Sequence, residues 1–239
     1  MYCLECYGKK YRIKGLEQEE FSELARGTGL SQGLLPDDES SDGEFVFTSV
    51  GAYFDLYQLG QRTIEAQPLE LLIEIVKGRV ASMTAQAFPE LLFLRGEALR
   101  WPSGDAVLLP GPSLVGKSRL AEQLRVPGSS FWSKGVIVID SEGALLPYPF
   151  DKVPAEERLE PGYIGLVTYD PKAVWEPEVL SAGQTVMALI PTVLTSRDDT
   201  PKILGVLGKL CSNAKWRCRC TWQDGAAVLD FLGQYTPQF

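Results

Sequence analysis

The chain has 239 residues, with 45% hydrophobic and 23% charged side chains, which are ordinary values for a globular protein and allow one large domain or two small ones. The formal net charge of -8 argues against nucleic acid as a partner, because the phosphate backbone would repel the chain. No run of about 18 apolar residues is present, so no membrane span is expected.

Two further features of the composition limit the chemistry and the compartment. The chain contains no histidine, which removes Ser-His and Cys-His nucleophile systems and histidine metal ligands. The segment that begins at Met1 has no basic region followed by an apolar one, so no secretion signal is expected. The odd number of cysteines agrees with reduced thiols, and we expect a cytoplasmic protein.

Two cysteine pairs raise the question of a zinc site. Cys3 and Cys6 have C-x-x-C spacing, and Cys218 and Cys220 lie two residues apart. On strands, the first pair would point to opposite faces and the second pair to one face. We therefore favour buried small hydrophobic residues over zinc ligands.

Residues 1–90 are predicted to form an α/β lead-in region that packs on the rest of the chain. The expected elements are a strand over 1–14, a helix over 17–26, paired strands over 44–50 and 52–57, and an amphipathic helix that begins after Pro68. The strands are predicted from their β-branched and aromatic residues, and the last helix from apolar residues at helical spacing.

The next segment leads to a phosphate-binding motif. Strands are predicted over 91–94 and 97–101, and a turn then leads into an apolar strand over 105–110. That strand runs into Gly111-Pro112-Ser113-Leu114-Val115-Gly116-Lys117-Ser118, a complete G-x-x-x-x-G-K-S sequence. A helix that begins at Arg119 completes the strand, loop and helix that this motif requires, so a chance match is the less favoured interpretation.

The residue types of this motif suit the phosphates of a nucleotide. Backbone N–H groups of such a loop and the start of the following helix form a nest for phosphate oxygens. Lys117 would place a positive charge at the β and γ phosphates, and the Ser118 hydroxyl would reach Mg²⁺. Gly111 and Gly116 supply the backbone freedom of the loop. We therefore expect Gly111 to Arg119 to bind ATP, with Mg²⁺ at Ser118.

Strands and helices continue after the loop and predict the α/β class. The expected elements are strands over 136–140, 144–146, 165–169 and 215–221, and helices over 182–194, 201–211 and 224–232. In the strand over 215–221, alternation predicts that Lys215, Arg217 and Arg219 face water while Trp216, Cys218 and Cys220 face the core. This interpretation is favoured over a basic nucleic-acid site.

Four stretches of the chain carry a family resemblance. Leu92–Ala98, Val107–Ser118, Ser133–Gly143 and Gly165–Asp170 resemble, in this order, the C-terminal kinase domain of HPr kinase/phosphorylase and the related HPr-kinase-like serine kinases. The resemblance implies a phosphoenolpyruvate-carboxykinase-like P-loop fold over 91–239, with mixed sheets and flanking helices. It also implies ATP, Mg²⁺ and phosphoryl transfer to a serine hydroxyl of a protein or peptide.

The chain departs from this family at two reactive positions. Relatives usually carry Ser-Asp-Asp or Ser-Asp-Glu where this chain has Ser133-Lys134-Gly135. They also tend to have histidine at the position of Arg95. Both reactive side chains are therefore missing from their usual places.

Other carboxylates compete for the role of the missing acid. Asp140 follows four apolar residues, as in a Walker B strand, and is a catalytic candidate together with Lys117. It lies six residues from Lys134, however, or about 20 Å on an extended strand, so the two positions cannot serve one loop. A turn-initiating aspartate is the simpler interpretation of Asp140. Glu97 and Asp105 flank the strands before the loop and are further candidates.

Two functions are compatible with these residues. One is an active kinase in which Lys117 and Ser118 hold ATP with Mg²⁺ and an unidentified carboxylate acts as the base. The other is a pseudokinase that binds nucleotide and serves as a regulatory or assembly subunit, which Arg95 and Lys134 favour. Either form would have a protein or peptide partner. A homo-oligomer or a larger assembly is also expected, because the HPr kinases of the family form rings.

Overall fold

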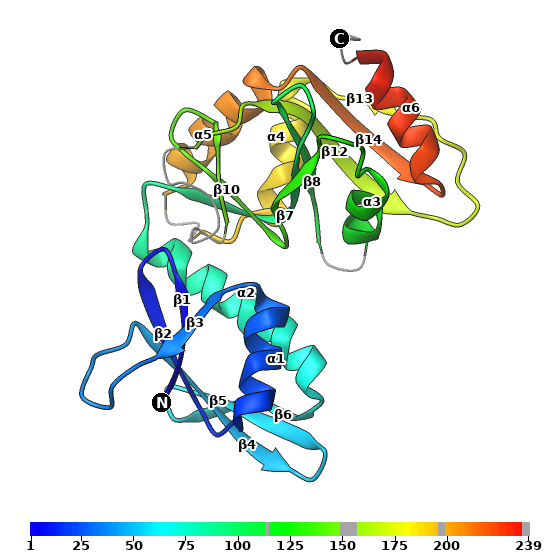
Figure 1. Cartoon of the computed structure of the whole chain (residues 1–239). Coiled ribbons are helices and arrows are strands. Elements are labelled where there is room, and N and C mark those ends of the chain that lie inside the picture. Colours follow the sequence, from blue (N-terminus) through cyan, green and yellow to red (C-terminus); the bar gives the residue numbers. More distant parts are fainter. Residues whose placement is uncertain (113–114, 149–156, 196–198, 236–239) are drawn as a thin grey trace. The chain divides into compact units, whose positions relative to one another are not determined.

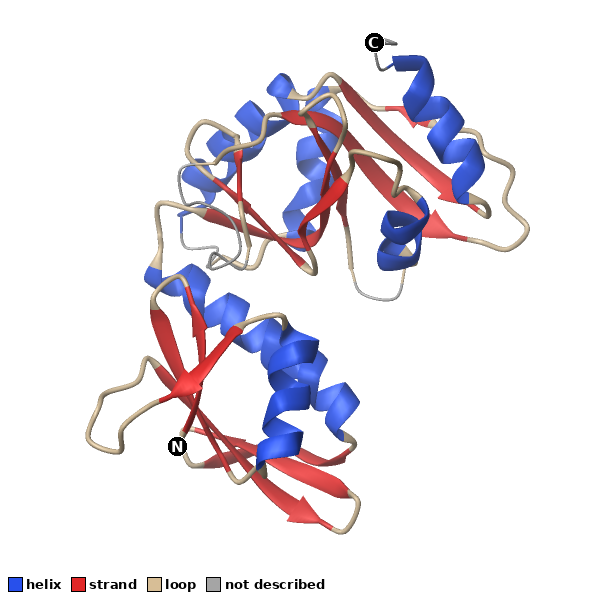
Figure 2. Cartoon of the chain, in the orientation of Figure 1, coloured by secondary structure: helices blue, strands red, loops and turns tan. Residues whose placement is uncertain are grey.

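The computed structural model describes residues 1–112, 115–148, 157–195 and 199–235. The chain divides into two compact units: the first is Met1–Ala87, and the second consists of the described residues from Phe88 onward. Each unit has its own mixed sheet and its own helices, so the chain is a mixed α/β protein (Figure 2). The division falls close to the expected boundary between residues 90 and 91.

Met1–Ala87, which are all described, form a six-stranded sheet with two helices (Figure 1). The strands are β1 (Tyr2–Cys6), β2 (Lys9–Lys14), β3 (Ser31–Leu34), β4 (Gly43–Val50), β5 (Tyr53–Gln58) and β6 (Gln61–Gln67), in the spatial order β3-β1-β2-β4-β5-β6. The helices are α1 (Gln18–Thr28) and α2 (Leu69–Ala87). A hydrogen bond of 2.7 Å between the hydroxyl groups of Tyr11 and Thr84 ties β2 to α2.

The two helices and the paired strands expected in the first unit are confirmed, the single strand expected over 1–14 is corrected to two strands, and two further strands are added. The predicted first strand is a hairpin of β1 and β2, and α1 begins with a capping box between Glu17 and Glu20 and ends at Gly29 in a left-handed conformation. The added strands, β3 and β6, are the edges of the sheet, and most of their residues are exposed. They lack the apolar alternation that identifies a strand in a sequence.

The described part of the second unit forms an eight-stranded sheet. Its strands are β7 (Leu92–Arg100), β8 (Ala106–Pro110), β9 (Ser130–Ser133), β10 (Val136–Ile139), β11 (Leu145–Leu146), β12 (Pro161–Tyr169), β13 (Glu178–Val179) and β14 (Trp216–Trp222). The spatial order is β11-β10-β7-β8-β12-β14-β13, with β9 also paired to β7. Strands β8, β12 and β14 run parallel, whereas β7 is antiparallel to β8 and β10.

Helices cover both faces of this sheet (Figure 1). The helices are α3 (Lys117–Gln123), α4 (Ala182–Leu189), α5 (Thr200–Asn213) and α6 (Gly225–Tyr235), with a short 3-10 turn η2 (Ile190–Thr192) after α4. Residues of α4 and α5 belong to the core on one face, and residues of α3 and α6 belong to the core on the other. Because both faces are covered, every residue of β8 and β10 is buried and neither strand alternates.

Two expected elements of this unit have different bounds. Residues 91–94 and 97–101 were expected as separate strands, but they belong to one continuous strand, β7, which contains Arg95 and Gly96. The helix expected over 182–194 ends at Leu189 and tightens into η2 at Pro191. Proline cannot donate the next helical hydrogen bond, which explains the early end.

The alternation predicted for β14 is confirmed for its cysteines and corrected for one arginine. Cys218 and Cys220 are buried and Arg219 is exposed. Arg217 is only half-exposed, because its guanidinium donates hydrogen bonds to the carbonyl groups of Cys211 and Ala214 at the end of α5. It therefore caps a helix rather than facing water.

The cysteines occupy core positions. All five lie in the described part of the chain, all are buried, and no disulfide links them. The interpretation as small buried hydrophobic residues is confirmed by these positions, with Cys218 and Cys220 packed beside Trp222 in one core cluster.

Candidate functional site

The G-x-x-x-x-G-K-S motif joins β8 to α3. Strand β8 ends at Pro110; its parallel neighbour β12 and the next parallel strand, β14, end at Tyr169 and Trp222, in the same direction. The carbonyl group of Val115 in the loop accepts a hydrogen bond of 3.0 Å from the Tyr169 N–H. The motif therefore lies at the carboxyl edge of the parallel strands, where open α/β sheets bind their ligands.

The two glycines of the motif adopt backbone conformations that favour glycine. The φ angles are 152° at Gly111 and 86° at Gly116. A β-carbon on Gly116 would also lie 2.6 Å from the β-carbon of Tyr169, which is closer than real side chains approach. Ser113 and Leu114, which were expected to contribute to the loop, lie outside the described residues.

Lys117 is folded back into the loop. Its side chain is buried, and its ammonium group donates a hydrogen bond to the carbonyl oxygen of Pro112. Burial lowers the pKa of Lys117 from its usual value; the nearby Glu97 carboxylate opposes this change and the Arg95 guanidinium adds to it. A buried ammonium with so few partners would be stabilised by an anion bound in the loop.

A carboxylate lies directly beside the motif. The Ser118 hydroxyl donates a hydrogen bond of 2.8 Å to Oε1 of Glu97, which projects from β7. Glu97 is only 5% exposed, a rare environment for a glutamate. Glu97 had no better support in the sequence than Asp140 or Asp105. The signal that could have found it is an acid within Leu92–Leu99, a largely apolar stretch whose other charged residue is Arg95.

Arg95 completes the charges around the loop. It lies two residues before Glu97 on β7, and therefore on the same face of the sheet. Its carbonyl group accepts a hydrogen bond of 3.1 Å from the Gly111 N–H, and its side chain is exposed. Arg95 and Lys117 give two positive charges against the one negative charge of Glu97. This balance suits an anion such as phosphate.

The turn with Lys134 and Gly135, where the HPr-kinase-like proteins that the chain resembles usually carry an acid, lies next to this site, but the Lys134 side chain pairs elsewhere. The Gly135 carbonyl accepts a hydrogen bond of 3.1 Å from the Gly96 N–H, which places the turn after β9 beside β7. The Lys134 ammonium lies 3.2 Å from the Glu122 carboxylate on α3 and 3.8 Å from the centre of the Phe131 ring. Lys134 therefore pairs with the surface of α3.

The structure does not bring Asp140 to the loop. Asp140 follows β10, five residues beyond Gly135, which corresponds to about 16 Å along a strand. Its Oδ1 accepts the N–H groups of Glu142 and Ala144, and its Oδ2 lies 3.0 Å from the Arg158 guanidinium. These contacts are those of an aspartate that holds a turn.

Two other residues suggested by the sequence have partners of their own. Asp105 lies at the amino end of β8, and its carboxylate forms an ion pair with Lys215 at 2.5 Å. Arg119, the residue after the motif, lies with its guanidinium 4.7 Å from the centre of the Tyr169 ring. Arg119 therefore packs on the end of β12 beside the loop, whereas Asp105 is at the opposite end of β8.

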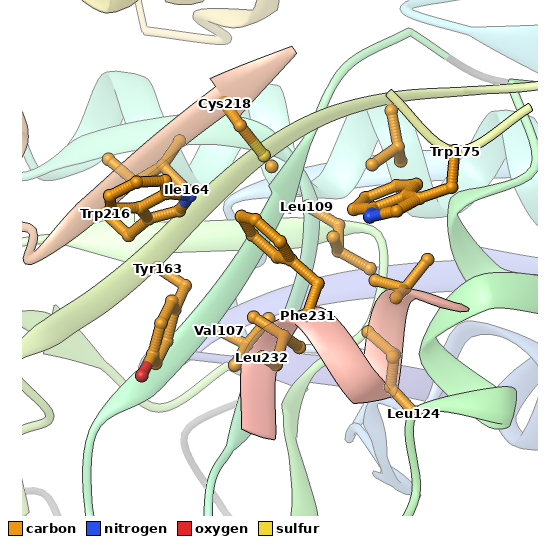
Figure 3. A pocket seen from close by; sticks show the side chains of 13 residues that line it. Val107, Leu109, Leu124, Tyr163, Ile164, Trp175, Trp216, Cys218, Phe231 and Leu232 are labelled. Atoms are coloured by element: carbon orange, nitrogen blue, oxygen red, sulfur yellow. The ribbon is translucent and has the colours of Figure 1, made fainter. Parts of the chain in front are cut away.

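A cavity elsewhere in the second unit is too small for a nucleotide. It lies between the sheet and α6, has a volume of about 20 Å³ and is lined by apolar side chains that include Trp175, Trp216 and Phe231 (Figure 3). The ring centres of Trp175 and Phe231 are 5.6 Å apart. This volume corresponds to about one water molecule, so the cavity is a packing void.

A divalent cation would find few protein ligands near the loop. Among the described residues, no group of three or more Cys, Asp or Glu side chains is placed to hold a metal. Mg²⁺ bound with a nucleotide needs only one or two protein oxygens, because phosphates and water supply the others. Ser118 and Glu97 offer such a pair.

No protein-family model matches the chain, and no curated protein matches it. Within the described residues, no helix has both the length and the apolar character needed to cross a membrane. The chain is a mixed α/β protein with a G-x-x-x-x-G-K-S sequence at the carboxyl edge of its parallel strands. The resemblance to HPr-kinase-like proteins rests on stretches of sequence alone.

Proposed function

We propose that the chain is an HPr-kinase-like protein that binds ATP with Mg²⁺ and transfers the γ-phosphoryl group to a serine of a protein or peptide. The observation that carries this proposal is the grouping of Lys117, Ser118 and Glu97 beside the loop at the end of β8. Phosphoryl transfer depends mainly on positioning and on neutralising charge, and these side chains supply both signs of charge where phosphates would lie.

The residues of the loop would exchange their present partners for the nucleotide. The Lys117 ammonium, now bonded to the Pro112 carbonyl, would turn to the phosphate oxygens. The Ser118 hydroxyl would be a ligand of Mg²⁺. The ion would neutralise the charge of the phosphates and orient them. The exposed Arg95 is near enough to Lys117 to affect its pKa, and it would add a second cation for the phosphate chain.

The alternative is a pseudokinase that binds nucleotide and acts as a regulatory or assembly subunit. The observation in its favour is that no acid reaches the loop from the two positions where one was considered. Position 134 is a lysine, which pairs with Glu122, and Asp140 holds a turn. Loss of a positioned general base lowers a rate by about 10²- to 10⁴-fold. A steady rate of phosphoryl transfer from labelled ATP to serine peptides would separate the kinase from the pseudokinase.

The partner and the compartment belong to the same proposal. We place the protein in the cytoplasm, which supplies ATP and Mg²⁺ and keeps thiols reduced, in keeping with the five cysteines that no disulfide links. The acceptor or partner would be a protein or peptide, and the working form a homo-oligomer or a subunit of a larger assembly.

The test is calorimetric titration of the whole protein with ATP in the presence of Mg²⁺, for the wild type and for Lys117→Ala. A charged hydrogen bond contributes about 1.5–3 kcal/mol, so the Kd should rise about 10- to 150-fold in the variant. Lys209→Ala is the matched control, because that lysine is exposed and lies on α5, on the other face of the sheet. Equal affinities of Lys117→Ala and wild type would refute nucleotide binding at this loop.

A further inference from the structure

We propose that Glu97 is the carboxylate that makes nucleotide binding by this chain depend on a divalent cation, with the Ser118 hydroxyl as its partner. This inference rests on the proposed function and adds to it a residue that the family resemblance does not supply. It identifies the replacement for the acid missing at Lys134, and it places that replacement on a different strand.

The position of Glu97 is rigid. Strand β7 lies inside the sheet, with β8 paired on one side and β9 and β10 on the other. Glu97 pairs with Leu109, which lies two residues before Gly111 of the motif. The register of β7 with β8 therefore fixes how far along the strands Glu97 lies from the loop. A carboxylate held in this way is prearranged to act on whatever the loop binds.

The surroundings of Glu97 are suited to a cation. Its side chain is 5% exposed, whereas Ser118 is exposed, so the pair lies at the border between solvent and the protein interior. Oε1 of Glu97 and Oγ of Ser118 are 2.8 Å apart, close enough for both oxygens to bind one ion. Mg²⁺ prefers oxygen ligands and commonly keeps one or two from the protein when phosphates supply the others.

The same carboxylate opposes phosphate when no cation is present. Lys117 lies near Glu97 in the present structure, but nucleotide phosphates would compete for its ammonium. The negative charge of Glu97 would then face the negative phosphates at low exposure to water, where charge repulsion is strong. A divalent cation between them would turn this repulsion into attraction. The geometry therefore links nucleotide affinity to the cation through one residue.

Other carboxylates near the carboxyl edge are less suited to this role. Asp170 follows β12 at the same edge, but it is exposed and its Oδ1 accepts the Lys172 N–H. Asp140 lies at the far end of β10 and holds a turn. Asp170 is useful as a control, since a change to asparagine there removes the same charge from the same edge of the sheet.

The experiment compares calorimetric titrations with ATP in Mg²⁺ and in EDTA for wild type, Glu97→Gln and Asp170→Asn. We expect the wild type and Asp170→Asn to bind much more tightly with Mg²⁺. In Glu97→Gln the affinity with Mg²⁺ should fall about 10- to 100-fold, and the affinity in EDTA should rise, so that the two values converge. Glutamine has the same shape as glutamate and can still accept the Ser118 hydroxyl, so the fold should be retained.

The outcomes separate this inference from the proposed function. A wild type that binds ATP equally well with Mg²⁺ and in EDTA overturns the role of Glu97 and leaves nucleotide binding intact. A Glu97→Gln variant with the Mg²⁺ preference of the wild type does the same. A wild type that binds no ATP in either buffer overturns both. Should Glu97→Gln fail to fold, Glu97→Asp keeps the charge, and it should retain a Mg²⁺ preference that is weaker than in wild type; an unchanged preference contradicts the inference.

Discussion

Replacing Gly116 by alanine should destabilise the second unit and distort the loop that carries the G-x-x-x-x-G-K-S motif. Gly116 has a φ angle of 86°, and a left-handed conformation costs a residue with a β-carbon about 1–2 kcal/mol. The new β-carbon would lie 2.6 Å from the β-carbon of Tyr169 and 3.3 Å from the Trp222 ring. Overpacking of this kind costs about 1–3 kcal/mol, so the total is about 2–5 kcal/mol.

The tryptophans provide a specific assay for this prediction. All five, at positions 101, 132, 175, 216 and 222, belong to the second unit, so their fluorescence follows its unfolding in urea. Gly205→Ala is the matched control, because Gly205 is in the middle of α5 with open space around it. It should stabilise the unit by up to about 1 kcal/mol. If Gly116→Ala unfolds within about 1 kcal/mol of the wild type, the tight packing of the loop on β12 and β14 is refuted.

Two further predictions concern the first unit and the position of the missing acid. The Ala66 N–H, which donates a hydrogen bond to the Asp55 carboxylate, holds the pKa of that carboxyl below its usual value of 3.8. Burial opposes this change, and the Arg62 guanidinium adds to it. The stability that results is present above pH 3.8 and is lost as the pH falls through the lower pKa of the folded state. In Asp55→Asn the stability of the first unit should therefore depend less on pH in acid, as measured by the NMR signals of its amide groups. The same pH dependence in the variant and the wild type would contradict this prediction. Lys134→Asp removes an exposed ion pair with Glu122 and the contact with Phe131, at a cost of about 1–2 kcal/mol. If the chain is a pseudokinase that lacks only its acid, this substitution should raise turnover of ATP with Mg²⁺, and a wild type that is already fast would contradict the pseudokinase.

Local patterns in the sequence were sufficient to predict most of the elements. Helix α2, strand β8 and the motif between β8 and α3 follow from apolar spacing, from Pro68 and from Gly111 and Gly116, whereas the single strand expected over 1–14 is a hairpin. These features act over a few residues, because helix and strand periods and left-handed φ angles are properties of short segments. The edge strands β3 and β6 escaped prediction because their pairing depends on neighbouring strands and not on their own residues.

The arrangement of charges at the candidate site depends instead on contacts between distant segments. Glu97 meets Ser118 across 21 residues of sequence, through the pairing of β7 with β8 and the direction in which α3 leaves the loop. Lys134 likewise meets Glu122 of α3 across 12 residues of sequence. Composition and spacing could name Glu97, Asp105 and Asp140 as candidate acids, but they could not rank these three residues. The ranking follows from strand register and burial, which exist only once the chain has packed into a sheet.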